Sequence, residues 1–279
     1  MIGPEFDHFC TLVGVRSGLV LGRDKAYLVG SRLEPIARQH GLADVPALLA
    51  RLKAGAPESL IAQCVDAMAT HEILFFRDTT PFEQMERLVL PAIADARPAG
   101  QPLRIWSAAC SSGQEAYSIA MLCQENAHRL AGRRVEIVGT DMAEAILVKA
   151  RAGLYSSFEV QRGLSPQRTA KWMTPKGAGF EVSQTLKSMV SFRRHNLLDG
   201  MAGMGVFDII FCRNVLIYFD QAKKSQVMNQ LAGALALDGA LFLGSAETVM
   251  GLTDALALQP GSRGLYRRRE AVQATARSA

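Results

Sequence analysis

Charged and polar side chains stand at three points where a predicted strand ends. Glu115 lies just beyond the small-residue loop 107–113, Asp141 closes the second strand, and Arg213 and Asn214 directly follow the third. In an open parallel sheet, ligands bind at the carboxyl ends of the strands. These residues are therefore candidates for binding a small ligand that carries both charged groups and hydroxyls.

The loop at residues 107–113 reads Ser-Ala-Ala-Cys-Ser-Ser-Gly, so a ligand can approach its backbone closely. The helix that follows offers free N–H groups at its start, which suit an anion. The loop lacks the G-x-G-x-x-G pattern, which favours a single carboxylate over a dinucleotide. Glu115 has two interpretations: it pairs with a ligand ammonium group, or it closes a capping box that begins at Ser112.

Asp141 can accept hydrogen bonds from both hydroxyls of a ribose, or it can cap the helix that starts after it. Ribose binding is the favoured interpretation, because strand, small-residue loop and acid occur together. Core packing does not explain Arg213 and Asn214, although a turn explains Asn214. Arg77, which follows two phenylalanines, is equally compatible with binding and with an ordinary surface position.

Other chemistries find little support in the sequence. An aromatic pair such as Tyr218 and Phe219 more often packs in a core than takes part in catalysis. The five histidines occur in no metal-binding spacing, and no Ser-His-Asp order is visible. The five cysteines are odd in number and none lies two or three residues from another, which argues against disulfides and a zinc clip. Metal and covalent catalysis are therefore not expected.

The elements that must position these residues form a regular alternation beyond residue 102. Short apolar runs bounded by small or polar residues predict strands, and amphipathic stretches between them predict helices. Such an order implies βαβ units with a parallel, Rossmann-like sheet. The predicted strands are 103–108, 135–141, 207–212 and 240–244, and the helices are 113–129, 143–152 and 221–237.

The segment 153–195 breaks this alternation and is predicted to be a small antiparallel β-insert, with a helix at 166–173 and a hairpin at 179–192. Up to residue 97 the apolar spacing is helical throughout, including a helix at 81–96. A Pro/Gly-rich stretch at 98–102 is the best linker in the chain. The sequence therefore predicts an all-helical domain at 1–97 and an α/β domain at 98–279.

Composition bounds the class of protein. The chain has 279 residues, 49% hydrophobic and 20% charged, typical of a globular protein. No apolar run reaches the ~18 residues of a membrane span, and the acidic start is unlike a secretory signal. We therefore expect a cytoplasmic protein. Residues 1–98 carry 10 basic and 12 acidic side chains, a net charge of −2. Because the whole chain carries +5, residues 99–279 carry +7. That excess favours an acidic partner, or is simply a solvated basic face.

Four segments in order resemble the chemotaxis receptor methyltransferases. They read Phe-Phe-Arg-Asp at 75–78, Trp-Ser-Ala-Ala-Cys-Ser-Ser-Gly-Gln-Glu-Ala-Tyr-Ser at 106–118, Gly-Thr-Asp at 139–141, and Phe-Asp-Ile-Ile-Phe-Cys-Arg-Asn-Val-Leu-Ile-Tyr-Phe-Asp at 207–220. The resemblance spans nearly the whole chain. It implies a helical N-terminal domain, an S-adenosylmethionine-binding domain and an insert that touches the receptor. The implied reaction methylates receptor glutamates and releases S-adenosylhomocysteine.

The resemblance also implies roles for individual residues. The cofactor's methionine portion would be held at both charged ends, its ribose by an acid and its adenine by the segment after the insert. His71 and Ile73 stand where many members have asparagine and threonine, and Ala116 replaces a common proline. Carried over by position, Arg77 would contact the carboxylate, Glu115 the amino group, Asp141 the ribose, Asn196 and Leu197 the adenine, while Arg213 and Asn214 would line the cofactor and Tyr218 would face the transferred methyl.

Two alternatives remain open at this stage. The basic half is also compatible with a nucleic-acid methyltransferase, but the Pro-Pro-aromatic motif common in enzymes that methylate base amino groups is absent: residues 214–218 read Asn-Val-Leu-Ile-Tyr. The other alternative is a non-catalytic module that senses the cofactor or docks on receptors. The expected partners are the cytoplasmic domains of chemotaxis receptors, with no nucleic acid and no membrane insertion. Because the connection at 173–180 is short and contains Pro175, no receptor C-terminal tether is expected.

Overall fold

The computed structural model describes residues 2–70 and 72–278, which divide into two compact units. Among the described residues, the first contains 2–70 and 218–223, and the second contains 72–217 and 224–278. The division after residue 70 differs from the boundary predicted at 97. The reason is packing: Phe82, Met85 and Ile93, from the helical run at 80–96, belong to the core cluster that also contains the sheet. Apolar periodicity identifies a helix but not the core it joins.

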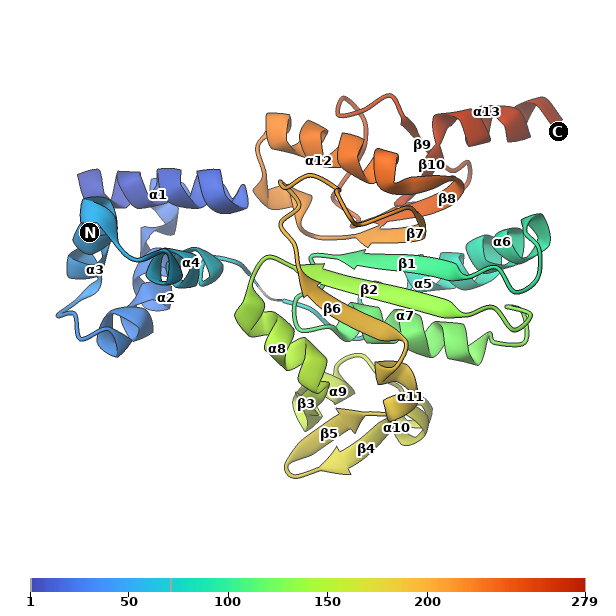
Figure 1. Cartoon of the computed structure of the whole chain (residues 1–279), viewed down its shortest axis with the longest axis horizontal. Helices are drawn as coiled ribbons and strands as arrows, with labels where there is room; N and C mark the ends of the chain where they lie inside the picture. The colour runs from blue at the N-terminus through green and yellow to red at the C-terminus, as the bar shows by residue number, and fades with distance from the viewer. Residues whose placement is uncertain (1, 71, 279) are drawn as a thin grey trace. The chain divides into compact units, whose positions relative to one another are not determined.

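The first unit is a set of short helices built around buried Phe6, Phe9, Leu33 and Leu48. Local signals set their ends. Asp44 accepts a hydrogen bond from the Ala47 amide (2.8 Å) and so caps the third helix. The described helices are α1 (Pro4–Ser17), η1 (Arg23–Lys25), α2 (Ala26–Gln39), α3 (Val45–Gly55) and α4 (Glu58–Asp66) (Figure 1).

The second unit contains, in its described part, a seven-stranded sheet of order β6-β2-β1-β7-β8-β10-β9. The first five strands in that order pair in parallel, and β10 and β9 are antiparallel additions. The order reverses between β1 and β7, which is the topological switch point at which such sheets bind ligands. The strands are β1 (Leu103–Ala108), β2 (Val135–Asp141), β6 (Val190–Arg194), β7 (Phe207–Cys212), β8 (Leu235–Leu243), β9 (Leu256–Leu258) and β10 (Leu265–Arg268).

Helices supply the apolar partners of this sheet. Alternate strand residues, such as Ile209 and Phe211, share one core cluster with Ile119 of the helix that follows β1, as expected when side chains alternate between the two faces of a strand. The helix predicted at 81–96 is continuous in the structure, with a π-helical turn at Met85–Val89 between two α-helical parts. The helices are α5 (Thr80–Gln84), η2 (Met85–Val89), α6 (Leu90–Ala96), α7 (Gln114–Glu125), α8 (Glu144–Ala152) and α13 (Arg269–Ser278). Two more, η3 (Leu216–Tyr218) and α12 (Gln221–Ala234), are divided between the units, because residues 218–223 belong to the first.

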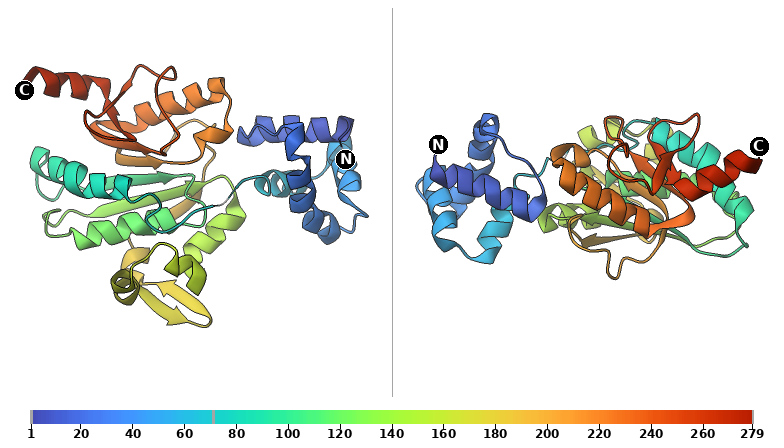
Figure 2. Two further views of the ribbon diagram at one scale, coloured as in Figure 1. Left: turned by 180° about the vertical axis from the view of Figure 1, so that it is seen from behind. Right: turned by 90° about the horizontal axis from the view of Figure 1, so that it is seen from above.

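A small antiparallel sheet of order β3-β5-β4 interrupts the alternation, which confirms the predicted α/β class with a β-insert. In Figures 1 and 2 it stands apart from the large sheet, beside α8 and the insert's own helices. Its elements are β3 (Leu154–Ser156), α9 (Ser157–Gln161), α10 (Pro166–Trp172), β4 (Met173–Lys176), β5 (Gly179–Val182) and α11 (Gln184–Lys187).

The hairpin predicted at 179–192 is wrong. The hairpin is β4–β5, whereas β6 leaves the insert and pairs in parallel with β2 of the large sheet. Phe192 on β6 explains the placement, because its ring packs on Tyr117 with centroids 5.6 Å apart. A Cβ atom at Gly139 would lie 2.6 Å from that ring. The glycine of the Gly-Thr-Asp segment therefore admits β6 to the sheet edge.

Candidate functional site

The predicted binding residues gather around the switch point of the large sheet. The loop between β1 and α7 has a constrained backbone: Ala109, Ser111 and Gly113 all have positive φ, at 54°, 50° and 92°. Such values are uncommon for residues other than glycine and occur preferentially where function fixes the backbone. The Cys110 amide donates to the Thr140 carbonyl (2.8 Å), which ties this loop to the end of β2.

A buried ion pair joins the ends of β1 and β7. Arg213 Nη1 donates to Glu115 Oε2 at 3.0 Å, and Ser107 Oγ donates to Glu115 Oε1 at 2.8 Å. The two charged side chains are 2% and 8% exposed. Glu115 therefore does not close a capping box: the helix N-cap is Gly113, with no side-chain cap. The carboxylate instead joins the two central strands, because α7 begins at one strand end and Arg213 follows the other.

Arg213 also holds the Phe-Phe-Arg-Asp segment. Its Nη2 donates to the Arg77 carbonyl (2.8 Å) and to Asp78 Oδ2 (2.9 Å). The segment is anchored by buried aromatic rings, Phe75 against Tyr155 and Phe76 against Phe82. Residues 76 and 78 both have positive φ, 48° and 54°. The Arg213 guanidinium thus holds Arg77 and Asp78 at the end of β7, although more than a hundred residues separate them from it in the sequence.

The Arg77 side chain itself is half-buried and lies outside this ion pair. Its Nη1 donates to the Glu72 carbonyl at 2.5 Å. Its backbone carbonyl, not its guanidinium, is the group that contacts Arg213. The carboxylate-binding role of Arg77 stays a prediction. Ile73, named with it as a departure from the family pattern, is half-buried, and His71 lies outside the described residues.

Asp141 is buried at the end of β2 and accepts two backbone hydrogen bonds. Its Oδ2 accepts from the Ser111 amide (2.9 Å) and its Oδ1 from the Ala143 amide (3.0 Å). The first bond reaches the loop after β1, and the second reaches the start of α8. Asp141 therefore supports two loops at the carboxyl edge of the sheet.

Asn196 and Leu197 follow β6 at the same edge of the sheet. Asn196 Oδ1 accepts from the Leu198 amide (3.1 Å), and Leu197 is buried. The preceding His195 lies against Trp106, with ring centroids 6.0 Å apart, and burial lowers its pKa. This turn is therefore well packed, and the predicted adenine contacts of both residues stay predictions.

Glu247, which the sequence analysis missed, holds the segment that bears Asn214. Its carboxylate accepts from the Asn214, Val215 and Leu216 amides at 2.9, 3.0 and 2.8 Å. Asn214 has φ of +59°. The available signal was an acidic residue in Gly-Ser-Ala-Glu, directly after the predicted strand 240–244. Without the fold, that acid resembles an ordinary helix cap.

Tyr218 and Phe219 belong to the first unit and differ sharply in burial. Phe219 is 6% exposed, whereas Tyr218 is 38% exposed. The Tyr218 carbonyl accepts from the Val20 amide at 3.0 Å, so the loop after α1 holds this segment. Core packing thus explains Phe219 but not the phenol of Tyr218, whose role near the methyl stays a prediction.

Two buried thiols lie near the candidate site. Burial raises the pKa of the Cys110 and Cys212 thiols well above the usual value, so both are neutral and poorly nucleophilic. Among the described residues no group of three His, Cys, Asp or Glu side chains could hold a metal. Over the same residues, no helix is both long and apolar enough to cross a bilayer.

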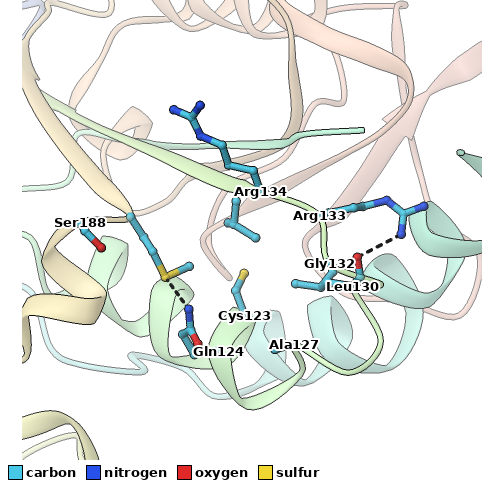
Figure 3. Close-up of a pocket in the computed structure, with 10 residues that line it drawn as sticks. Cys123, Gln124, Ala127, Leu130, Gly132, Arg133, Arg134 and Ser188 are labelled. Carbon is cyan, nitrogen blue, oxygen red and sulfur yellow. Dashed lines mark hydrogen bonds between the residues drawn. The ribbon is translucent and has the colours of Figure 1, made fainter. Parts of the chain in front are cut away.

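A cavity of about 330 Å³ lies at the opposite, amino-terminal end of β2 (Figure 3). None of the predicted site residues lines it. Figure 3 shows Arg133 pointing away from the opening toward the backbone, where it donates to the carbonyls of Leu130, Ala94, Arg97 and Pro98. That arginine secures the linker before β1. Because none of the predicted site residues lines the cavity, it is distinct from the candidate site.

Comparison with known proteins assigns the chain to a family. Residues 71–265 match the family described as CheR methyltransferase, SAM binding domain, and residues 4–69 match CheR methyltransferase, all-alpha domain. A chemotaxis protein methyltransferase of Vibrio parahaemolyticus is 45% identical over 90% of this chain and 91% of its own length. Chemotaxis protein methyltransferase 1 of Pseudomonas aeruginosa is 41% identical over 95% and 97%.

Proposed function

The chain belongs to the CheR methyltransferase family, and we propose that it transfers a methyl group from S-adenosylmethionine to glutamate side chains of chemotaxis receptors. The products are glutamyl methyl esters and S-adenosylhomocysteine. Full-length relatives named chemotaxis protein methyltransferases support the acceptor class. The observation that carries the proposal within the molecule is the buried Glu115–Arg213 pair at the switch point of the sheet.

The residues at this edge fit an S-adenosylmethionine molecule by their chemistry. Glu115 would hold the ammonium group and Arg77 the carboxylate of the methionine portion. Asp141 would accept the ribose hydroxyls, and Asn196 and Leu197 would hold the adenine. One observation favours a polar ligand beside Arg213: its Nε is buried and has no hydrogen-bond partner among the described residues. Buried donors of this kind normally have a hydrogen-bond partner, and a bound ligand would supply one. Arg213 and Asn214 would accordingly line the cofactor.

The proposed reaction asks the protein for alignment rather than proton transfer. S-adenosylmethionine supplies a methyl group on a positively charged sulfur. A receptor glutamate, with an ordinary pKa of about 4.3, is already ionised at neutral pH, so no general base is required. The protein's groups hold the two reactants in line, an effect that can lower a barrier by about 7–11 kcal/mol. The buried Glu115–Arg213 pair and the constrained loops suit that task, because both resist movement.

The function is tested by supplying labelled S-adenosylmethionine with receptor cytoplasmic domains, with RNA, or with neither. Label on the receptor that mild alkali releases as methanol supports glutamyl ester formation. Label on RNA would favour the nucleic-acid alternative, for which the basic C-terminal part is the motive and the absent Pro-Pro-aromatic motif the counter-argument. Cofactor binding without transfer to any acceptor would favour the non-catalytic alternative.

Asp141 gives a prediction about cofactor affinity. Asp141→Ala is expected to weaken S-adenosylmethionine binding by about 1–3 kcal/mol, because the ribose hydroxyls and the backbone amides that the carboxylate serves lose their acceptor. Part of that loss comes from the Ser111 and Ala143 amides, which the carboxylate holds in place. Calorimetry on the folded variant measures it. An unchanged affinity would leave Asp141 as an acceptor for backbone amides alone.

The proposed partners are the cytoplasmic domains of receptors. The proposed location is accordingly the cytoplasm, with no nucleic-acid partner and no membrane insertion. A short insert turn supports recognition that needs no receptor C-terminal tether. The β4–β5 connection is a tight turn at Gly177, whose φ is +58°, and Pro175 on edge strand β4 offers no amide to an added strand. Peptide addition at that edge is therefore disfavoured.

Removal of a receptor's last several residues is accordingly expected to leave its methylation rate within about twofold. Tethering acts by raising effective concentration, so an enzyme that lacks it loses nothing on truncation. The measurement compares initial rates on full-length and truncated forms of one receptor at subsaturating concentration. A rate that drops tenfold, or micromolar binding of the free C-terminal peptide, would contradict the absence of a tether.

A further inference from the structure

Glu247 occupies an unusual position for a charged side chain. It lies three residues beyond Gly244, just after β8, and is 9% exposed. Its Oε2 accepts from the amides of Asn214 (2.9 Å) and Gly244 (2.7 Å), and its Oε1 from those of Val215 (3.0 Å) and Leu216 (2.8 Å). One carboxylate therefore accepts four backbone hydrogen bonds, three of them from consecutive residues that follow β7.

These bonds hold a segment that has little intrinsic preference for its conformation. Asn214 lies in the left-handed region, with φ of +59°, which asparagine tolerates better than other residues with a Cβ atom but which still favours glycine. Gly244 is packed too closely to carry a side chain: a Cβ atom there would lie 2.7 Å from Glu247 Oε2 and 2.9 Å from the Asn214 amide nitrogen. Gly244 and Glu247 thus form one close-fitting seat for residues 214–216.

The acceptor must be a carboxylate. Four converging N–H groups need an acceptor-only partner, and an ionised carboxylate has two oxygens with about four acceptor positions. A glutamine would turn its NH₂ group toward two of these amides and leave them unsatisfied. Bonds to an ionised acceptor are also stronger than neutral ones. The seat is therefore specific to glutamate in both charge and length.

We propose that Glu247 is a positioning residue for methyl transfer, a proposal that rests on the function proposed above. It acts through the backbone: by fixing residues 214–216, it fixes the place of the Asn214 side chain and the direction in which the chain leaves Arg213. Glu247 touches neither reactant. Its effect is to keep the segment after β7 in the one conformation that presents Arg213 and Asn214 to the cofactor.

The test compares Glu247→Gln and Glu247→Asp with a matched control, Asp208→Asn. Asp208 is also a buried carboxylate on the β7–β8 strand pair, but it serves the other end of β7, where it accepts from the Arg104 amide (2.7 Å) and from Arg97. Both sites lose a buried charged acceptor, so both variants should lower Tm. Measurements are made on full-length protein well below either Tm, so that every variant is folded.

We expect Glu247→Gln to raise the Kd for S-adenosylmethionine and to lower kcat, each by about tenfold or more, while Asp208→Asn stays within about twofold on both. Glu247→Asp keeps the charge but is one methylene short, so it should lie between wild type and Glu247→Gln. Equal effects of Glu247→Gln and Asp208→Asn, or wild-type values for Glu247→Gln, would overturn the proposal. Should Glu247→Gln not fold, Glu247→Asp is held to the same comparison with Asp208→Asn.

Amide hydrogen exchange gives a readout that does not depend on activity. In both Glu247 variants the amides of residues 214–216 and 244 should exchange faster than in wild type, while those of 209–211 within β7 stay protected. Unchanged exchange at 214–216 would contradict the seat itself. Wild-type protein that neither binds S-adenosylmethionine nor methylates a receptor would contradict the proposed function, whereas an active wild type with an equally active Glu247→Gln would contradict only the positioning role.

Discussion

Replacing Arg213 with alanine is expected to lower the free energy of unfolding by about 3–5 kcal/mol, the usual result of removing one partner from a buried ion pair. Glu115 would remain buried with its charge unpaired, and the Arg77 carbonyl and Asp78 would lose their donor. Methyl transfer should fall by about 100-fold or more, the order found when a preorganised polar group is removed from an active site. Chemical denaturation and a receptor methylation assay measure the two effects.

Two comparisons separate stability from function. In the double variant Arg213→Ala/Glu115→Gln the orphaned charge is gone, so much of the stability should return. Activity should stay low, because Arg213 and Glu115 are both proposed to hold the cofactor. Arg168→Ala breaks a different arginine–glutamate pair, in which Arg168 is bidentate to Glu125 within the insert's attachment to α7; it should leave S-adenosylmethionine affinity unchanged. Activity that recovers together with stability in the double variant would contradict the proposed cofactor-binding roles of both Arg213 and Glu115.

Tyr218→Phe is expected to lower kcat by about tenfold or more while leaving the Kd for S-adenosylmethionine within about twofold. An interaction made only in the transition state affects turnover and not ground-state binding. Tyr218 is 38% exposed, so loss of its phenol oxygen should leave the free energy of unfolding nearly unchanged. Single-turnover rates and calorimetry provide the two measurements.

The matched control is Tyr27→Phe, which removes a phenol oxygen from another exposed tyrosine of the first unit, 71% exposed. It should behave as wild type in turnover, affinity and stability. If Tyr218→Phe also retained full turnover, the methyl-facing role carried over from the family resemblance would be withdrawn. The exposure of Tyr218 would then point to a surface role instead.

The sequence alone determined the elements whose signals are local. The strands at 103–108, 135–141 and 207–212 have the predicted bounds, because each is a short apolar run closed by small or charged residues. Their alternation with helices sufficed for the Rossmann-like class and for the edge at which Glu115 and Arg213 meet. Family membership and the methyltransferase activity also followed from motifs that are contiguous in the chain.

Only the tertiary structure decided which elements pair and which protein groups each acid contacts. Phe192 draws β6 to β2 rather than into the insert's hairpin, and residues 80–96 pack on the sheet rather than with the first helices. The sequence left a capping box at Glu115 open, whereas the structure shows its carboxylate paired with Arg213 instead. Glu247 gave no clear signal, because its four donors come from two strand ends. Periodicity reports which face of a segment is buried, whereas pairing depends on side-chain volume and hydrogen-bond acceptors contributed by residues far away in the chain.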